Sequence, residues 1–155
     1  MDTHQTSSFD IFADIEASTN NDELGEQITL LSARMNVATY QIIKLIAVFD
    51  RRDGWYGAGI RSCAHWLNWR CGLADSAARE RVRVARCLEK LPMINKAFAS
   101  GEISYSKVRA MTRVATDNNE DFLLMIAYHG TANHMEQLVR KYQRVEKNIA
   151  MEQED

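Results

Sequence analysis

The fold is decided by residues 62–86, which read SCAHWLNWRCGLADSAARERVRVAR. Ser62 is placed to cap a short helix, and Gly72 is placed to end it. Asp75 or Ser76 then caps a second helix. A short helix, a glycine turn and a capped second helix predict a helix-turn-helix, in which the second helix lies in the major groove of DNA.

Helical patterns continue on both sides of this stretch. Apolar residues recur every three or four positions, proline occurs once, and the turn residues that an all-β chain needs are scarce. The sequence therefore predicts an all-α fold, a single domain of about seven helices with a long N-terminal helix and a central helix-turn-helix-like core. The expected helices span about 22–53, 63–70, 75–90, 92–100, 105–115, 118–130 and 131–150.

Residues 22–150 are expected to form this helical domain, as a DNA-binding unit. Asp22 is the predicted N-cap of the long helix, and Gly54 is predicted to stop it. Residues 1–21 are polar and acidic, which predicts a disordered segment or a short acidic helical turn. Residues 151–155 are expected to fray.

Charge is segregated along the chain although the net charge is only −2. Residues 1–30 carry seven acids and no Lys or Arg, whereas residues 61–113 carry eleven bases against four acids, a net of +7. A basic middle is suited to an anionic polymer such as nucleic acid. The alternative is that the acidic ends fold back and neutralise it.

The second helix of the motif carries a predicted cationic ridge, made of Arg79, Arg83, Arg86 and Lys90. These residues fall within roughly 60° of arc at 100° per residue. Guanidinium groups form paired hydrogen bonds with phosphates or guanine edges, so the ridge predicts DNA contact. A solvated helix face paired with Glu80 and Glu89 is the alternative. The apolar side of this helix is predicted to comprise Ala78, Val82, Ala85, Leu88 and Leu91.

Further cations in the same segment are expected to contact flanking phosphates. They are Arg61, Arg70, Lys107, Arg109 and Arg113. Trp66 and Trp69 are three positions apart on one helix and are expected in the core rather than as base-stacking platforms. The environments of Trp55 and Tyr56, in a glycine-rich loop, stay open.

No motif for catalysis, a cofactor or a metal stands out. Cys63, His65 and Cys71 offer three ligands without the paired spacing of a structural zinc site, so no metal is predicted. The odd cysteine count suggests free thiols in a reducing compartment, which favours the cytoplasm. The chain has no stretch of about 18 apolar residues, so no membrane span is expected.

The stretch from Arg61 to Thr116, RSCAHWLNWRCGLADSAARERVRVARCLEKLPMINKAFASGEISYSKVRAMTRVAT, resembles domain-of-unknown-function family 222, also called the 13E12 repeat family. TYQIIKLIAVFDRRDGWYGAGIRSCAHWL and HGTANHMEQLVRKYQRV resemble the same family's opening and later helix, so the resemblance covers about residues 24–145. It implies an actinobacterial or mobile-element domain that precedes a C-terminal HNH endonuclease. The chain shows no nuclease motif of that kind, so no enzymatic activity is expected in it.

The sequence therefore favours a module that binds double-stranded DNA, without cofactor, and in longer relatives delivers it to the nuclease. The alternative is a protein-interaction or dimerisation module, whose surface would be the long helix 22–53 and the final helix 131–150, with a homodimer formed through the long helix.

Overall fold

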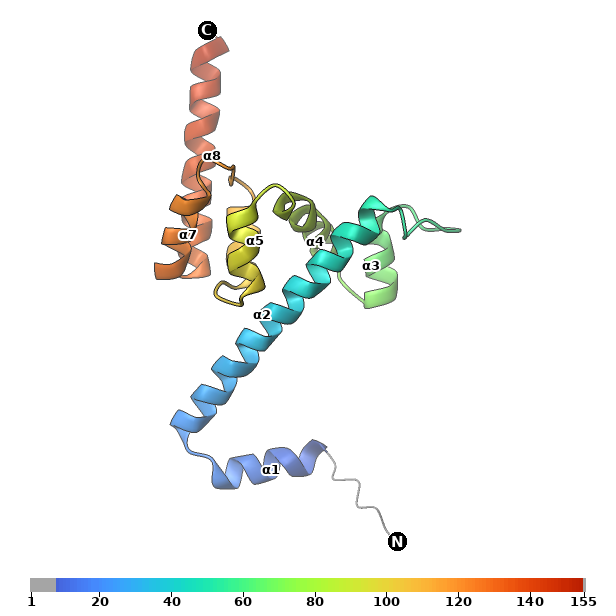
Figure 1. The fold of residues 1–155 in the computed structure, drawn as a ribbon, viewed down its shortest axis with the longest axis vertical. Coiled ribbons are helices and arrows are strands. Elements are labelled where there is room, and N and C mark those ends of the chain that lie inside the picture. The colour runs from blue at the N-terminus through green and yellow to red at the C-terminus, as the bar shows by residue number, and fades with distance from the viewer. Residues whose placement is uncertain (1–7, 155) are drawn as a thin grey trace. The chain divides into compact units, whose positions relative to one another are not determined.

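The computed structural model describes residues 8–154, and these form eight α-helices and no β-strand (Figure 1). The all-α prediction is therefore confirmed. The helices are α1 (Ser8–Ser18), α2 (Asn21–Arg51), α3 (Cys63–Cys71), α4 (Asp75–Leu88), α5 (Pro92–Ala99), α6 (Tyr105–Met111), α7 (Glu120–His129) and α8 (Ala132–Glu154). One helix more than expected is present because residues 8–18 are helical, and residues 151–154 continue α8.

The chain consists of two units, residues 1–32 and residues 33–155. The first contains α1 and the start of α2, and the predicted disorder of residues 1–7 lies outside the described residues. The N-cap of α2 is Asn20, not Asp22 as predicted. The Asn20 side-chain oxygen accepts the Glu23 backbone N–H at 2.9 Å, and the Glu23 carboxylate accepts the Asn20 N–H at 3.4 Å. This reciprocal pair is a capping box.

The second unit is built around one hydrophobic core. It buries side chains from seven helices, among them Ile43 of α2, Leu67 of α3, Leu88 of α4, Phe98 of α5, Met111 of α6, Leu123 of α7 and Met135 of α8. Within it, α4 packs against α3, α5 and α6, while α8 packs against α6 and α7. Helix α4 is thereby held on several sides.

The long helix ends two residues earlier than predicted, at Arg51. The left-handed residue after it is Asp53, with a φ of 51°, rather than Gly54. The Gly54 N–H then donates to the Phe49 carbonyl at 2.9 Å, which closes the helix with a Schellman-type bond. An aspartate tolerates this conformation better than most residues, so a glycine is not required there.

A buried carboxylate caps α5 from another helix. Pro92 stands in the first turn of α5, and no side chain at its N-cap bonds the helix. Instead, Glu120 at the start of α7 is fully buried and accepts the Ile94 N–H at 2.9 Å. This contact ties α5 to α7 and satisfies an otherwise unpaired amide.

No described helix combines the length and the apolar character needed to cross a membrane.

From Gln143 to residue 153, every residue of α8 is exposed.

Candidate nucleic-acid interface

Helix α3 begins and ends as its sequence predicts. The Ser62 hydroxyl accepts the His65 N–H at 3.0 Å, and the Arg61 N–H donates to the His65 Nδ1 at 3.1 Å. Gly72 ends the helix in the left-handed conformation, with a φ of 67°. The Asn68 amide then donates to the Leu73 carbonyl at 2.6 Å, which braces the turn that leads into α4.

Helix α4 buries the predicted apolar side, since Ala78, Val82, Ala85 and Leu88 all lie in the core. It starts at Asp75 with Ala74 at the N-cap and no side-chain cap bond, so the prediction of Asp75 or Ser76 as the cap is wrong. Leu91 is also buried, but as the N-cap residue of α5.

The buried surface of α4 is wider than the sequence predicts. Val84 is fully buried, although it was not among the expected core positions. Arg81 lies over the Tyr105 ring, with its guanidinium carbon 4.8 Å from the ring centroid. The cause is that α4 packs against α5 and α6 as well as α3.

Four of the predicted cations come together in one groove between the start of α3 and the exposed side of α4. The groove has a volume of about 660 Å³, and its wall includes Arg61, Arg79, Arg83 and Arg86. The first turn of α3, from Ser62 to His65, also lines it. The first-turn amides of a helix have no intrahelical acceptor and carry the positive end of its dipole, which favours anions.

Arg79 and Arg86 reach this groove from opposite ends of α4, and both have exposed side chains. Arg79 pairs with Asp75 one turn earlier. Arg86 makes a two-bonded contact with Asp50 of α2, at 2.7 and 3.0 Å, and Asp50 is only 13% exposed. Arg86 therefore also anchors α4 to α2.

Arg83 is the most enclosed member of the predicted ridge. Its side chain is 29% exposed and donates to the Glu80 carboxylate at 3.0 and 3.1 Å. It also donates to the Thr112 hydroxyl at 3.2 Å and to the Arg109 carbonyl at 3.0 Å. These bonds hold α4 against the end of α6. Arg83 therefore fixes the position of the groove wall to which it belongs.

Glu80 pairs with more arginines than the sequence predicts. Its carboxylate is 22% exposed and pairs with Arg83, with Arg113 at 2.8 Å and with Arg109 at 3.9 Å. The hydrogen bond from Arg83 lowers the pKa of Glu80 below its ordinary value, assisted by the charges of all three arginines and opposed by burial. The spacing from Glu80 to Arg83 is visible in the sequence, but its pairing with Arg109 of α6 and with Arg113 in the turn after α6 is not.

Three further predicted DNA contacts, Lys107, Lys90 and Arg70, do not line the groove. Lys107 donates to the Ala127 carbonyl at 2.6 Å and so holds the last turn of α7. Lys90 is exposed beside a smaller hollow that Asp117 also lines. Arg70 is exposed, with its guanidinium carbon 5.5 Å from the Trp69 ring centroid.

The two tryptophans of α3 have different environments. Trp66 packs against Phe49 with ring centroids 4.6 Å apart, as expected of a core residue. Trp69 is 65% exposed, so the prediction that it lies in the core is wrong. The two tryptophans are three residues apart on a nine-residue helix, and only the Trp66 ring packs against the core. In the loop before α3, Trp55 packs against the core and Tyr56 is exposed.

The buried thiol of Cys63 lies against the groove. Within the described residues, no group of three or more His, Cys, Asp or Glu side chains is arranged to hold a metal ion. Burial, together with the nearby Asp50 charge, raises the pKa of the Cys63 thiol to about 11. Cys63 therefore stays protonated and serves as a small core residue.

Together, the fold and the groove define an all-helical domain that displays a cluster of arginines beside α3 and α4. The chain belongs to the family described as Domain of unknown function (DUF222), whose model matches residues 22–141. No curated protein and no solved structure is significantly similar to it.

Proposed function

We propose that this chain is a DNA-binding domain in which α3, the Gly72 turn and α4 act as a helix-turn-helix. The observation that carries the proposal is the convergence of Arg61, Arg79 and Arg86 on one groove that the first turn of α3 also lines. Guanidinium groups and helix N-termini are both suited to phosphate oxygens.

The intramolecular partner of Arg79 is compatible with this role. Arg79 pairs with Asp75, and both side chains are exposed. Exposed ion pairs contribute about 0–1 kcal/mol, so a DNA phosphate is able to replace the carboxylate at little cost. Arg83 takes the role of positioning residue, because its bonds to Glu80 and α6 are already made within the fold. Arg70 and Lys90 are assigned to flanking phosphates.

The proposal extends to the biological setting. The DNA-binding domain acts in the cytoplasm without catalysis of its own. In longer relatives it delivers a duplex to an HNH nuclease domain. The odd number of cysteines supports the cytoplasmic setting, and the resemblance of residues 24–145 to family 222 supports the link to a nuclease.

Fluorescence anisotropy with labelled duplex DNA tests the proposal. We expect the wild type to bind in a salt-dependent manner and the variant Arg61→Ala/Arg79→Ala/Arg86→Ala to bind weakly. The slope of log K against log salt should fall by about 0.9 for each phosphate contact removed. An arginine that contacts a base should cost roughly 5- to 150-fold in affinity.

A matched control removes the same charge elsewhere. Arg34, Arg52 and Lys96 are exposed cations that do not line the groove. The variant Arg34→Ala/Arg52→Ala/Lys96→Ala should keep most of the affinity. Equal losses in the two triple variants would show only general attraction to charge. A folded wild type that binds no duplex at low salt would refute the proposed function.

Homodimerisation through α2 is the second candidate, and one observation favours it. Residues 28, 31, 35, 38, 42 and 45 follow the alternating three-four spacing of a coiled-coil seam. The large side chains of this set, Ile28, Leu31, Met35, Ile42 and Leu45, are 48–70% exposed. The core instead takes Ile43, Ile46 and Ala47 from another side of the helix. An apolar seam of this kind is suited to the same seam of a second copy.

A further inference from the structure

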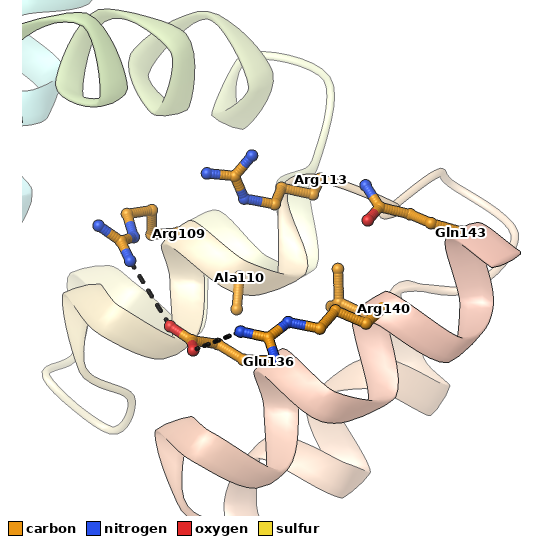
Figure 2. Close-up of a pocket in the computed structure, with 7 residues that line it drawn as sticks. Arg109, Ala110, Arg113, Glu136, Arg140 and Gln143 are labelled. Atoms are coloured by element: carbon orange, nitrogen blue, oxygen red, sulfur yellow. Dashed lines mark ion pairs between the residues drawn. The ribbon is translucent and has the colours of Figure 1, made fainter. Parts of the chain in front are cut away.

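A second cationic cleft lies between α6 and α8 (Figure 2). It has a volume of about 280 Å³ and is lined by Arg109 and Arg113 on one side and by Glu136, Arg140 and Gln143 of α8 on the other. Figure 2 shows the Arg109 and Arg140 side chains reaching toward Glu136 from the two sides. Arg140 lies 27 residues after Arg113 and 31 after Arg109 in the sequence, and packing places all three guanidinium groups around one hollow.

The ion pairs inside this cleft are long. Glu136 lies 3.5 Å from the Arg109 guanidinium and 4.0 Å from that of Arg140. Charge-assisted bonds between these groups are usually about 2.7–2.9 Å long. The Arg140 side chain is also 74% exposed. Arg109 and Arg140 therefore retain donor capacity for a further anion.

Positive charge exceeds negative charge in the connected network. Glu80 and Glu136 are the carboxylates, and Arg83, Arg109, Arg113 and Arg140 are the guanidinium groups, which leaves two positive charges in excess. Arg83 also lines the groove beside α3, so the Arg83–Glu80–Arg113 contacts join the two sites. Ion pairs through Glu80 therefore connect a residue of the groove with a residue of the cleft.

We propose that the cleft between α6 and α8 binds a phosphate group of the nucleic-acid backbone, with Arg140 and Arg109 as its main donors and Gln143 beside them. This inference rests on the proposed DNA-binding function and extends its surface to α8. The sequence gives little sign of it, because residues 114–155 carry four bases against eight acids. Only the packing of α8 on α6 brings Arg140 to the basic segment.

The test compares single variants of neighbouring cations on α8 in a duplex-DNA anisotropy titration at several salt concentrations. Arg140→Ala should weaken binding to all duplex sequences alike and lower the salt slope by about 0.9. Arg140→Lys should keep the slope, because the charge remains. Lys141→Ala is the matched control, since Lys141 is exposed on the same helix and does not line the cleft. It should leave the slope unchanged.

The outcomes separate the two proposals. Equal salt slopes for wild type, Arg140→Ala and Lys141→Ala would overturn the proposed phosphate site in the cleft and leave the proposed DNA binding intact. Equal losses in Arg140→Ala and Lys141→Ala would also overturn it, since the effect would then belong to the charge of α8 in general. A wild type that fails to bind DNA would remove the proposed function and the cleft together. Thermal unfolding of each variant checks that the exposed substitutions leave the fold unchanged.

Discussion

Glu80 joins α4 to α6 through one carboxylate. It accepts two bonds from Arg83, and Arg83 in turn bonds the Arg109 carbonyl and the Thr112 hydroxyl at the end of α6. Arg113 adds a third guanidinium at 2.8 Å. Because these groups are partly shielded from water, their pairing contributes more to stability than a surface ion pair does.

Stability should therefore depend on pH through Glu80. Its pKa in the folded state lies below the ordinary value of 4.5, so its contribution is fully present above that pH and is lost as the pH falls through the folded pKa. We expect Glu80→Gln to lower the free energy of unfolding by about 1–3 kcal/mol at pH 7. The difference from wild type should shrink as the pH falls below 4.5. Urea denaturation at a series of pH values measures it.

Glu89→Gln is the matched control for this prediction. Glu89 pairs with Arg51, and both side chains are exposed. Its replacement should cost no more than about 1 kcal/mol. A Glu80→Gln variant as stable as Glu89→Gln at pH 7 would contradict the role assigned to Glu80.

Two glycines end helices in the left-handed conformation but stand in different surroundings. Gly101, after α5, has a φ of 77°, and a Cβ there would lie 3.0 Å from Val37 and 3.5 Å from the Ala33 carbonyl oxygen, both in α2. Gly72, after α3, has a φ of 67° and open space around it. Gly101 is therefore required both for its left-handed backbone and for the close packing of α2 against it. Gly72 is required for its left-handed backbone alone.

The two alanine variants should separate these effects. Gly72→Ala carries only the backbone penalty of about 1–2 kcal/mol. Gly101→Ala carries a similar penalty and also forces Val37 to move, so its loss of unfolding free energy should be larger. Chemical denaturation of both variants measures the difference. Equal losses would mean that Val37 adjusts freely and that the close approach has no energetic weight.

Helix α4 shows how packing changes the use of a charged ridge. Its four cations follow one face in the sequence, yet Arg83 bonds α6, Arg86 bonds α2, and Lys90 lies beside a separate hollow. Arg79 is exposed and pairs only one turn away. Arg83 and Arg86 of the ridge therefore stabilise helix packing, whereas Arg79 remains a surface residue.

The exposed seam of α2 leads to a prediction about the whole molecule. If the chain dimerises there, Met35→Glu/Leu45→Glu should shift a dimer to a monomer in analytical ultracentrifugation, because charges in an apolar seam are costly to bury. Met125→Glu, at an exposed apolar residue of α7, is the control and should leave the dimer intact. A wild type that is monomeric at high micromolar concentration would contradict the prediction.

Ionic strength distinguishes the two candidate functions of the molecule. Binding of duplex DNA through several cations weakens steeply with added salt. Association through the apolar α2 seam should hardly change. Both behaviours in one protein would fit a dimer that presents two copies of α4 to DNA.

The sequence by itself determined the all-α class, most helix limits and the location of the basic segment. Local signals suffice for these features. Ser62, Gly72 and Pro92 act through hydrogen bonds or backbone angles within a few residues of themselves.

Only the tertiary structure decided which charged side chains pair between helices and which remain at the surface. Asp50 with Arg86, Glu80 with Arg113 and Glu136 with Arg109 are pairs separated by 27 to 36 residues. Helical periodicity describes the direction of a side chain around its own axis, but not the neighbour that packs there. For the same reason, the exposure of Trp69 and the cleft at Arg140 appeared only once the helices were assembled.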